Sequence, residues 1–261
     1  MIVGNDVASY QGDINYDVYK NNTNFVIMKS TEGNGFVDPK FKRNQSESRR
    51  VNLPLGYYHF ARPDLGNTPE AEANFFLQTL GELKPGEVLC LDYEPPVQTQ
   101  ADVDWCKKWL DFVQAKTKVK SFVYLNQSQV KKFDWKKVID GGYALWIAAY
   151  TGSPTNNNFV TGQWPTAAMQ QWTSSQKVPG ILNGTGNVDG NAFFGDANQF
   201  KKYGFPESVP VPPTDPCEEV KKENEKLKKE NQDLKKDKES LTNRVNDLEE
   251  RLEKINGLSA I

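Results

Sequence analysis

The sequence predicts an α/β domain built on a parallel β-sheet, followed by a proline-rich linker and a C-terminal coiled-coil helix. Three observations support this. Short apolar runs alternate with helical patterns over residues 1–205, prolines crowd residues 206–216, and apolar residues recur every seven positions from Val220 onward. Alternation of strand and helix is typical of α/β folds, and a sustained heptad repeat is typical of coiled coils.

Seven short apolar segments in the first 205 residues are predicted to be buried strands. Several lack the polar alternation of half-exposed strands, which suits parallel strands covered on both faces. Strand and helix in repeated order predict a parallel sheet that is either closed as a barrel or doubly wound. After residue 163 the helical segments vanish, and short strands and turns are expected. The predicted strands are Ile2–Val7, Phe25–Met28, Leu55–Phe60, Val88–Leu91, Ser121–Leu125, Leu145–Ala149 and Ala167–Trp172.

Two helices are marked by their terminal residues and their apolar spacing. Thr68 offers an N-cap hydroxyl, Pro69 suits the first helical position, and Glu70 puts negative charge at the positive end of the helix dipole. Gly81 ends this helix. A second helix is predicted over residues 102–116, because apolar side chains recur there at helical spacing. These side chains are Trp105, Trp109, Phe112 and Val113.

The C-terminal region combines a stiff spacer with a heptad repeat. Five prolines in residues 206–216 predict an extended linker without a core of its own. Residues 217–256 follow as a predicted coiled coil, and residues 257–261 form a short tail. Asn224 and Asn231 occupy successive a positions, which with leucine at d favours a parallel homodimer. The d positions are Val220, Leu227, Leu234, Leu241, Leu248 and Ile255.

Two questions about the coiled coil stay open at this point. A lone charged helix or a disordered tail is the alternative, although a stripe of two apolar residues in seven leaves such a helix little to bury itself against. Cys217 falls at an a position, where the two copies of a parallel dimer face each other. In an oxidising exterior, these two thiols could join the dimer covalently.

Composition excludes several classes of function. A net charge of -2 and a pI near 5.7 do not indicate binding to nucleic acid or to an anionic membrane surface. No apolar run approaches the ~18 residues of a membrane span. The single histidine and three widely spaced cysteines predict neither a metal site nor a redox motif. The first ten residues lack the basic and apolar regions of a signal peptide, so we expect synthesis in the cytoplasm.

The stretch VLCLDYEPP, residues 88–96, places two acids at the end of a buried strand. Asp92 and Glu94 are two apart in an extended segment, so their side chains point to the same face, while Leu91 and Tyr93 point to the other. Two carboxylates in one partly dry pocket raise the pKa of at least one of them. One acid and one carboxylate at neutral pH are what glycoside cleavage requires. Solvated or ion-paired acids are the alternative reading.

Two other acids and several aromatic residues support a carbohydrate site. Asp6 ends an apolar strand and Asp189 follows another, and neither has a Lys or Arg beside it in the sequence. Sugar rings stack on aromatic faces, while their hydroxyls bind carboxylates and amides. For each aromatic residue alone, a place in the core is an equally good interpretation. The aromatic residues are Tyr10, Tyr57, Tyr58, Tyr93, Tyr150 and Trp172.

Other polar residues of these segments have competing interpretations. Glu32 either contacts substrate or caps a loop, and Lys29 is a candidate to neutralise an acid of the site. Strand alternation puts Tyr58 and His59 on opposite faces. We favour Tyr58 for the cleft and His59 as a structural histidine.

Several motifs in order resemble glycoside hydrolase family 25, the Chalaropsis-type lysozymes common among phage endolysins. The motifs are DVASYQGDIN, MKSTEGNGFVDPKF, GYYHFARP, LDYEPP, LWIAAYT, MQQWTSSQKVPGI and VDGN, and they cover residues 1–200. The resemblance implies a modified TIM-like (β/α)5β3 barrel over residues 1–205, in which the later strands lack helices. It implies no metal and no cofactor.

The same resemblance implies an activity and roles for the acids. The activity is hydrolysis of the β-1,4 bond between N-acetylmuramic acid and N-acetylglucosamine in peptidoglycan. Glu94 corresponds to the general acid, and Asp6, Asp92 and Asp189 correspond to the other acidic site residues, with Asp6 orienting its neighbours. We favour attack by the N-acetyl oxygen of the substrate, steadied by Asp92, over a direct carboxylate nucleophile. Tyr150 and Trp172 are expected at the rim, with Tyr10, Tyr58 and Glu32 as further substrate contacts.

The sequence therefore predicts a muramidase that serves as a phage endolysin and acts on the host wall after holin-dependent release. The coiled coil stands where such lysins usually carry a wall-binding module. The alternative is a non-catalytic wall-binding or adaptor module multimerised by the coiled coil. A chitinase is less favoured, since a D-x-x-D-x-D-x-E run is missing from VLCLDYEPP.

Overall fold

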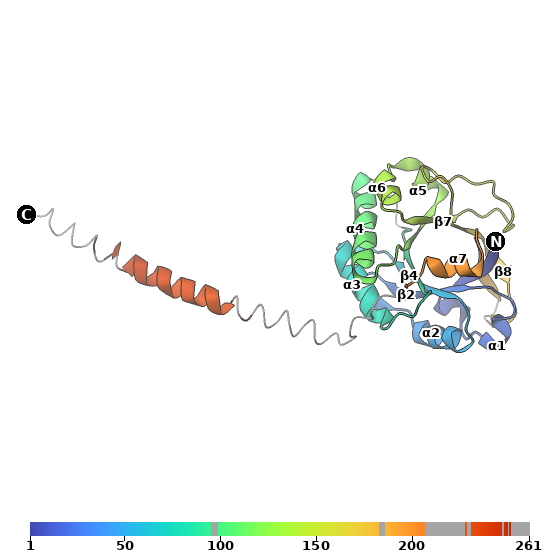
Figure 1. Ribbon diagram of the computed structural model, residues 1–261, viewed down its shortest axis with the longest axis horizontal. Coiled ribbons are helices and arrows are strands. Elements are labelled where there is room, and N and C mark those ends of the chain that lie inside the picture. The colour runs from blue at the N-terminus through green and yellow to red at the C-terminus, as the bar shows by residue number, and fades with distance from the viewer. Residues whose placement is uncertain are drawn as a thin grey trace, which may run out of the picture. The chain divides into compact units, whose positions relative to one another are not determined.

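The computed structural model describes residues 1–94, 99–182, 186–206, 228, 231–246, 248–249 and 251. The chain divides into two compact units, Met1–Val211 and Pro212–Ile261. The first holds all the strands of Figure 1, and the second holds a helix over residues 231–246. Residues 207–216 of the predicted linker (206–216), residues 217–227 of the predicted coiled coil and the predicted tail over residues 257–261 lie outside the described residues.

Eight strands of the first unit form a closed barrel. Parallel pairing runs from β1 to β2 and on through β4, β5, β6, β7 and β8. β9 lies antiparallel between β8 and β1 and closes the ring. The short β3 (Phe36–Val37) is a side strand on β2. The barrel strands are β1 (Ile2–Val7), β2 (Val26–Glu32), β4 (Leu55–Phe60), β5 (Val88–Asp92), β6 (Phe122–Asn126), β7 (Ala144–Ala148), β8 (Met169–Lys177) and β9 (Asn187–Phe193).

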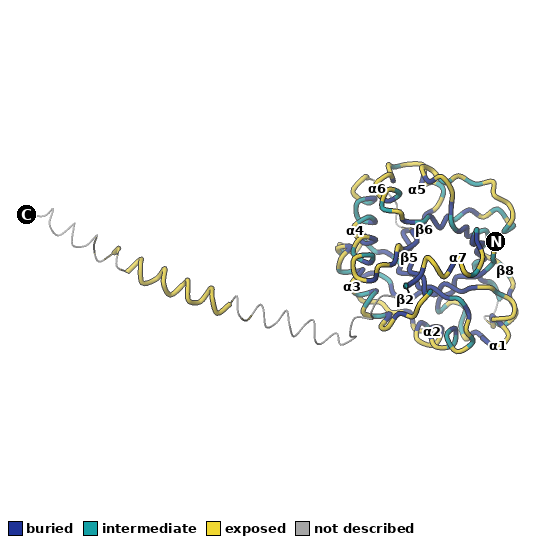
Figure 2. The backbone as a smooth tube through the Cα atoms, in the orientation of Figure 1, coloured by how far each residue is buried: buried dark blue, intermediate teal, exposed yellow. Residues whose placement is uncertain are grey.

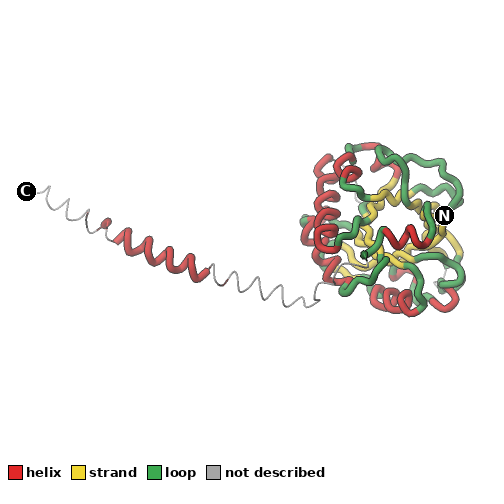
Figure 3. The backbone as a smooth tube through the Cα atoms, viewed as in Figure 1, coloured by secondary structure: helices red, strands yellow, loops and turns green. Residues whose placement is uncertain are grey.

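Helices follow each of the first five barrel strands and lie outside the ring of strands (Figure 3). Thr68 caps α3 by accepting a hydrogen bond from the backbone N–H of Ala71 at 3.2 Å, as its sequence predicts. The helices are α1 (Tyr16–Tyr19), α2 (Phe41–Arg50), α3 (Pro69–Leu80), α4 (Gln100–Thr117), α5 (Gln127–Lys132) and α6 (Lys136–Asp140). Two 3-10 turns, Ser9–Gln11 and Pro63–Leu65, complete the outer elements.

Strand alternation divides the apolar side chains into two cores. The barrel strands that carry them are mostly dark blue, that is buried, in Figure 2. On β5, Val88 and Cys90 belong to the core inside the barrel, whereas Leu89 and Leu91 belong to the core between barrel and helices. Tyr93 joins the outer core, where its ring lies 5.9 Å from Trp105 of α4. Because side chains alternate along a strand, Asp92 continues the row of Val88 and Cys90 toward the barrel axis.

A short helix near the end of the barrel unit closes one end of the barrel. α7 (Ala197–Lys202) places the Phe200 ring 4.7 Å from Phe25 and 5.4 Å from Phe193, inside the inner core. Phe25 precedes β2, so α7 covers the end where the parallel strands begin. The opposite end, where these strands finish, is left for a cleft.

The fold expected from the sequence is confirmed as a closed α/β barrel, and the doubly wound alternative is wrong. Two details differ from expectation. α7 appears where only strands and turns were expected, and β8 extends to Lys177 rather than ending at Trp172. The extension follows from pairing with β9, since Gln176 and Lys177 are in register with Val188 and Asn187.

The helix of the second unit exposes a row of apolar side chains. Leu234, Leu241 and Val245 are each more than half exposed, at 64%, 58% and 51%. Leu234, Lys238, Leu241 and Val245 line one groove along this helix. No helix among the described residues is long and apolar enough to cross a membrane.

Candidate active site

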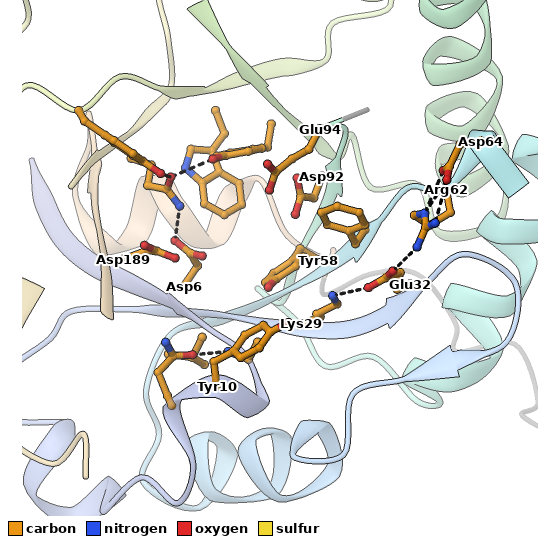
Figure 4. Close-up of a pocket in the computed structure, with 18 residues that line it drawn as sticks. Asp6, Tyr10, Lys29, Glu32, Tyr58, Arg62, Asp64, Asp92, Glu94 and Asp189 are labelled. Atoms are coloured by element: carbon orange, nitrogen blue, oxygen red, sulfur yellow. Dashed lines mark hydrogen bonds and ion pairs between the residues drawn. The ribbon is translucent and has the colours of Figure 1, made fainter. Parts of the chain in front are cut away.

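A cleft of about 720 Å³ opens at the end of the barrel where the parallel strands finish (Figure 4). In parallel barrels, side chains at these strand ends line the active site. Acidic and aromatic side chains dominate the lining. The polar and aromatic lining residues are Asp6, Tyr10, Gln11, Lys29, Glu32, Tyr58, Phe60, Arg62, Asp64, Asp92, Glu94, Tyr124, Trp146, Tyr150, Gln171 and Asp189.

The four acids predicted from the sequence meet in this cleft. Asp6 is the last residue but one of β1, and it is the direct cross-strand partner of Asp189, which lies within β9 rather than after a strand as expected. Asp92 ends β5 and Glu94 follows two residues later, so both point into the cleft (Figure 4). Asp6 and Asp92 are each only 7% exposed, whereas Glu94 is exposed at the opening. Three strands thus bring together side chains that are far apart in the chain.

The carboxylate of Asp6 is held by neutral amides. Its Oδ2 accepts a hydrogen bond from Gln171 Nε2 at 2.9 Å and another from Asn191 Nδ2 at 2.7 Å. Asp6 also shares a hydrogen bond with Asp189. Burial raises the pKa of Asp6, and the hydrogen bonds that it accepts oppose that rise.

Mutual repulsion and burial keep protons on the neighbouring acids. Burial raises the pKa of Asp92 well above its ordinary value, and the nearby charges of Glu94 and Asp6 add to the effect. Burial also raises the pKa of Glu94, with Asp6 adding to the rise and Lys29 opposing it. Burial and the charge of Asp6 raise the pKa of Asp189 to about 8. At neutral pH, Asp189 therefore favours its protonated form.

One oxygen of Asp92 has no partner. Its Oδ1 is buried, and it accepts no hydrogen bond within the described residues. An unpaired buried acceptor costs on the order of 1–3 kcal/mol. Since Asp92 lines the cleft, a donor on a bound ligand would satisfy this oxygen.

A chain of ion pairs forms another part of the lining. Lys29 bonds Glu32 Oε2 at 2.7 Å, and Arg62 bonds Glu32 Oε1 at 2.7 Å. Arg62 also bonds Asp64 at 2.8 Å. The direct ion pair of Lys29 is therefore with Glu32, and its influence on Asp92 and Glu94 is electrostatic. Glu32 lies in the lining and is held there by two cations.

Of the six aromatic residues singled out in the sequence, three line the cleft and three do not. Tyr10, Tyr58 and Tyr150 line it, with Tyr10 83% exposed and Tyr150 62% exposed. Tyr57 and Tyr93 belong to the core between barrel and helices. Trp172, which was expected at the rim, is absent from the lining. Gln171 of β8 faces the cleft, and alternation turns Trp172 to the outer face. Trp146 of β7 lines the cleft instead.

His59 is structural, as expected. The ring is fully buried, with Nε2 2.8 Å from Glu72 Oε2 and Nδ1 2.8 Å from the Thr31 hydroxyl. Burial lowers the pKa of His59, with Glu72 opposing. The carboxylate of Glu72 also accepts a hydrogen bond from the backbone N–H of Arg62 at 3.1 Å. This network fixes the loop that carries Arg62 into the cleft.

Sequence reasoning missed Tyr124, Trp146 and Gln171. Each of these residues lies on a predicted strand. The alternation of side chains along a strand could have assigned Tyr124 to the cleft. Tyr124 is the cross-strand neighbour of Asp92 and shares its inward face. Among the described residues, no group of three or more His, Cys, Asp or Glu side chains is arranged to hold a metal ion.

Clustered carboxyl groups between aromatic walls at the mouth of a barrel fit a glycoside hydrolase site, which needs a pair of acidic residues. Comparison with known families agrees. The model of glycosyl hydrolases family 25 matches residues 5–181, so the chain belongs to this family. It is a glycoside hydrolase of the lysozyme type.

Similar proteins share this assignment. Lysozyme M1 of Streptomyces globisporus is 26% identical over 217 residues, which are 75% of this chain and 69% of that protein. An N,O-diacetylmuramidase of Arthroderma benhamiae is 23% identical over 77% of this chain and 86% of its own. Among solved structures, a lysozyme from Streptomyces coelicolor superposes with a TM-score of 0.65 at 22% identity, covering 78% of this chain and 96% of its own. The CTP1L endolysin gives 0.63 at 27% identity, covering 77% and 70%.

The raised pKa of Asp189 predicts that stability falls as pH rises. An unfolded aspartate titrates near 3.8, and the folded group titrates near 8. The folded state therefore binds the proton more tightly, and the stability this contributes is complete below pH 4 and is lost up to about pH 8. We expect Asp189→Asn to raise the thermal midpoint more at pH 8 than at pH 4.5. Calorimetry at the two pH values measures this, and an equal effect at both would contradict it.

Proposed function

We propose that this cleft hydrolyses the β-1,4 bond between N-acetylmuramic acid and N-acetylglucosamine in peptidoglycan, with Glu94 as the general acid. The observation that carries the proposal is the cluster of four carboxyl groups at the barrel mouth, none of which forms an ion pair within the described residues. Such a cluster retains protons at neutral pH, and protonation of the leaving oxygen requires a carboxyl group that still carries its proton.

Glu94 is the acid best placed to protonate the leaving oxygen. It lies at the opening of the cleft, where a polymer chain can reach it, and its raised pKa favours the protonated form that can donate. Asp6 and Asp92 lie deeper and are nearly inaccessible to solvent. The exposed group therefore donates the proton, and the buried groups set its charge state.

Asp92 steadies the acetamide of the substrate. Its buried Oδ1 lacks a donor, and an acetamide N–H supplies one. Orienting that group brings the acetamide oxygen toward the anomeric carbon, where it displaces the leaving group and forms a cyclic cation. A direct carboxylate nucleophile would need the two carboxyl groups about 5 to 5.5 Å apart. The assisted route uses Asp92 without requiring it to attack.

Asp6 and Asp189 act on the other acids rather than on the sugar bond. Asp6 is held by Gln171 and Asn191, and its charge raises the pKa of both Asp92 and Glu94. Asp189 shares a hydrogen bond with Asp6 and completes the acidic floor. Together they orient the pair that contacts the substrate.

The aromatic walls hold the sugar rings. The rings of Tyr10 and Tyr150 are largely exposed, and Tyr58 lines the cleft between β2 and β5. Such surfaces stack on the C–H faces of sugars, and Glu32 offers oxygens to their hydroxyls. An open cleft of this kind suits a polymer rather than a small molecule.

The biological setting we propose is lysis of a bacterial host from within by a phage endolysin. The likeness to the CTP1L endolysin supports this. In that setting the protein is made in the host cytoplasm and reaches the wall after a holin opens the membrane.

The C-terminal helix joins two copies of the enzyme. Its heptad a and d positions, Lys238, Val245, Leu234 and Leu241, line one groove, flanked by Asp237 and Thr242 at g and e. Exposed leucines on one face of a charged helix support a parallel homodimer over residues 217–256. Two barrels on one dimer would engage the same polymer and gain avidity.

Glu94→Gln should abolish release of new reducing ends from purified peptidoglycan, with a loss of at least about 100-fold, because the amide cannot donate an acidic proton. Mass spectrometry of the products identifies muramic acid at the new reducing end. Glu70→Gln, the same change at an exposed site on α3, should leave release unchanged. Glucosamine ends, cut peptides or an unaffected Glu94→Gln variant would refute the assignment, and no release at all would favour a non-catalytic wall-binding module.

A substrate without the N-acetyl group on the muramic acid residue tests the role of Asp92. We expect turnover to fall by at least about tenfold, because the internal nucleophile is gone. Comparison of initial rates on acetylated and deacetylated glycan measures the effect. Unchanged turnover would sink the assisted route.

The coiled coil is tested by sedimentation of the full chain at micromolar concentration, where we expect a dimer. Leu234→Asp combined with Leu241→Asp should yield monomers, because negative charges would replace the apolar d positions that pack between the two helices. Asn243→Ala, on the opposite face, should not. Deletion of residues 207–261 should also yield a monomer and leave hydrolysis of soluble glycan intact. A monomeric full chain would remove the dimer, and loss of hydrolysis on deletion would contradict an independent barrel.

A further inference from the structure

A buried amide lies between the acidic floor of the cleft and its exposed rim. Gln171 of β8 donates from Nε2 to Asp6 Oδ2 at 2.9 Å. Its Oε1 accepts hydrogen bonds from the hydroxyls of Tyr124 at 2.8 Å and Tyr150 at 3.1 Å. The Gln171 side chain is buried, with 4% exposure, so it forms hydrogen bonds with these three partners rather than with water.

The partners of Gln171 fix which way its amide points. The tyrosine hydroxyls donate to the carbonyl oxygen, so the NH2 group faces Asp6, which can only accept when ionised. Asn191 is locked in the same way, since its Oδ1 accepts from Trp146 Nε1 at 2.8 Å while its Nδ2 donates to Asp6. Two oriented amides thus converge on a single carboxylate oxygen.

The amides of Gln171 and Asn191 stabilise the buried carboxylate of Asp6, a role that a cation usually has for a buried acid. The Lys29 ammonium in the cleft bonds Glu32 at 2.7 Å, and Asp6 has no ion pair within the described residues. A buried carboxylate without a cation stays ionised only if hydrogen bonds favour its charged form. Donors from Gln171 and Asn191 supply that preference without cancelling the negative charge. The charge of Asp6 therefore remains available to act on Glu94.

We propose that Gln171 is a positioning residue, which keeps Asp6 ionised so that Glu94 retains its proton and which holds Tyr150 at the rim against the substrate. The inference rests on the proposed function, because it assigns Gln171 to the proton transfer made by Glu94. Gln171 need not touch the substrate. It acts on the floor through its NH2 group and on the rim through its carbonyl oxygen.

A change at Gln171 is expected to alter the pH–rate profile through the charged groups around Asp6. Loss of the amide lets Asp6 take up a proton at higher pH, which removes negative charge from beside Glu94. Glu94 then loses its proton at lower pH, so the alkaline limb of the pH–rate profile moves toward acid. The titratable and charged groups around Asp6 are Asp92 and Glu94 of the β5 end, Asp189 of β9, Lys29 and Glu32 of β2, Tyr58 of β4, Tyr124 of β6 and Tyr150 after β7.

The test compares three variants in the peptidoglycan release assay across pH. Gln171→Met keeps the length of the side chain and removes both the donor to Asp6 and the acceptor for the two tyrosine hydroxyls. Gln171→Glu keeps an acceptor for the tyrosines, and it can donate to Asp6 only while the introduced carboxyl is protonated. Ser175→Ala, at an exposed position on the same strand, is the matched control.

For Gln171→Met we expect kcat to fall about tenfold to a hundredfold, KM to change less, and the alkaline limb to move toward acid. Gln171→Glu should approach the wild-type kcat at the acid end and lose activity as pH rises. A Gln171→Met profile that superimposes on wild type would overturn the inference, as would equal losses in both variants at every pH. If Gln171→Met does not fold, the pH-dependent rescue in Gln171→Glu decides alone. Wild-type protein that releases no muramic acid would overturn the proposed function and this inference with it.

Discussion

Four carboxyl groups crowd one end of a closed barrel, and none of them has a cation as a bonded partner within the described residues. The rest of the site depends on this constraint. Burial raises the pKa of all four acids, and the charges of neighbouring acids add to the rise at Asp92, Glu94 and Asp189. At Asp6, amide donors oppose the rise. The protonation state of each acid therefore depends on the whole cluster rather than on that residue alone.

The barrel creates the crowding by simple alternation. On β5 the inward row runs Val88, Cys90 and Asp92, so the same rule that fills the barrel with apolar side chains ends it with an acid. α7 closes the opposite end with Phe200. One end of the barrel is thus committed to packing and the other to chemistry. The chain of Lys29, Glu32, Arg62 and Asp64 shows the contrast, because these charges neutralise one another where the four acids do not.

Much of this could be predicted from sequence, where local pattern carries the information. Strand parity placed Asp92 on the inward face and Tyr93 on the outer one, and a terminal threonine and proline marked α3. Trp172 was expected at the rim but does not line the cleft, because an aromatic residue near a strand end is equally compatible with either face. The parity of β8 is fixed by its pairing with β9, which a single sequence does not reveal. Gln171 and Asn191 escaped notice because their importance lies in a shared partner 165 and 185 residues away.

The central claim is that the charge of Asp6 raises the pKa of Glu94 above its ordinary value. Carboxyl 13C NMR titration of Glu94, in wild type and in Asp6→Asn, tests it without any turnover. We predict a midpoint above the ordinary value of 4.5 in wild type and a lower midpoint in the variant. A wild-type midpoint at or below 4.5, or one that does not move when Asp6 loses its charge, would contradict the account.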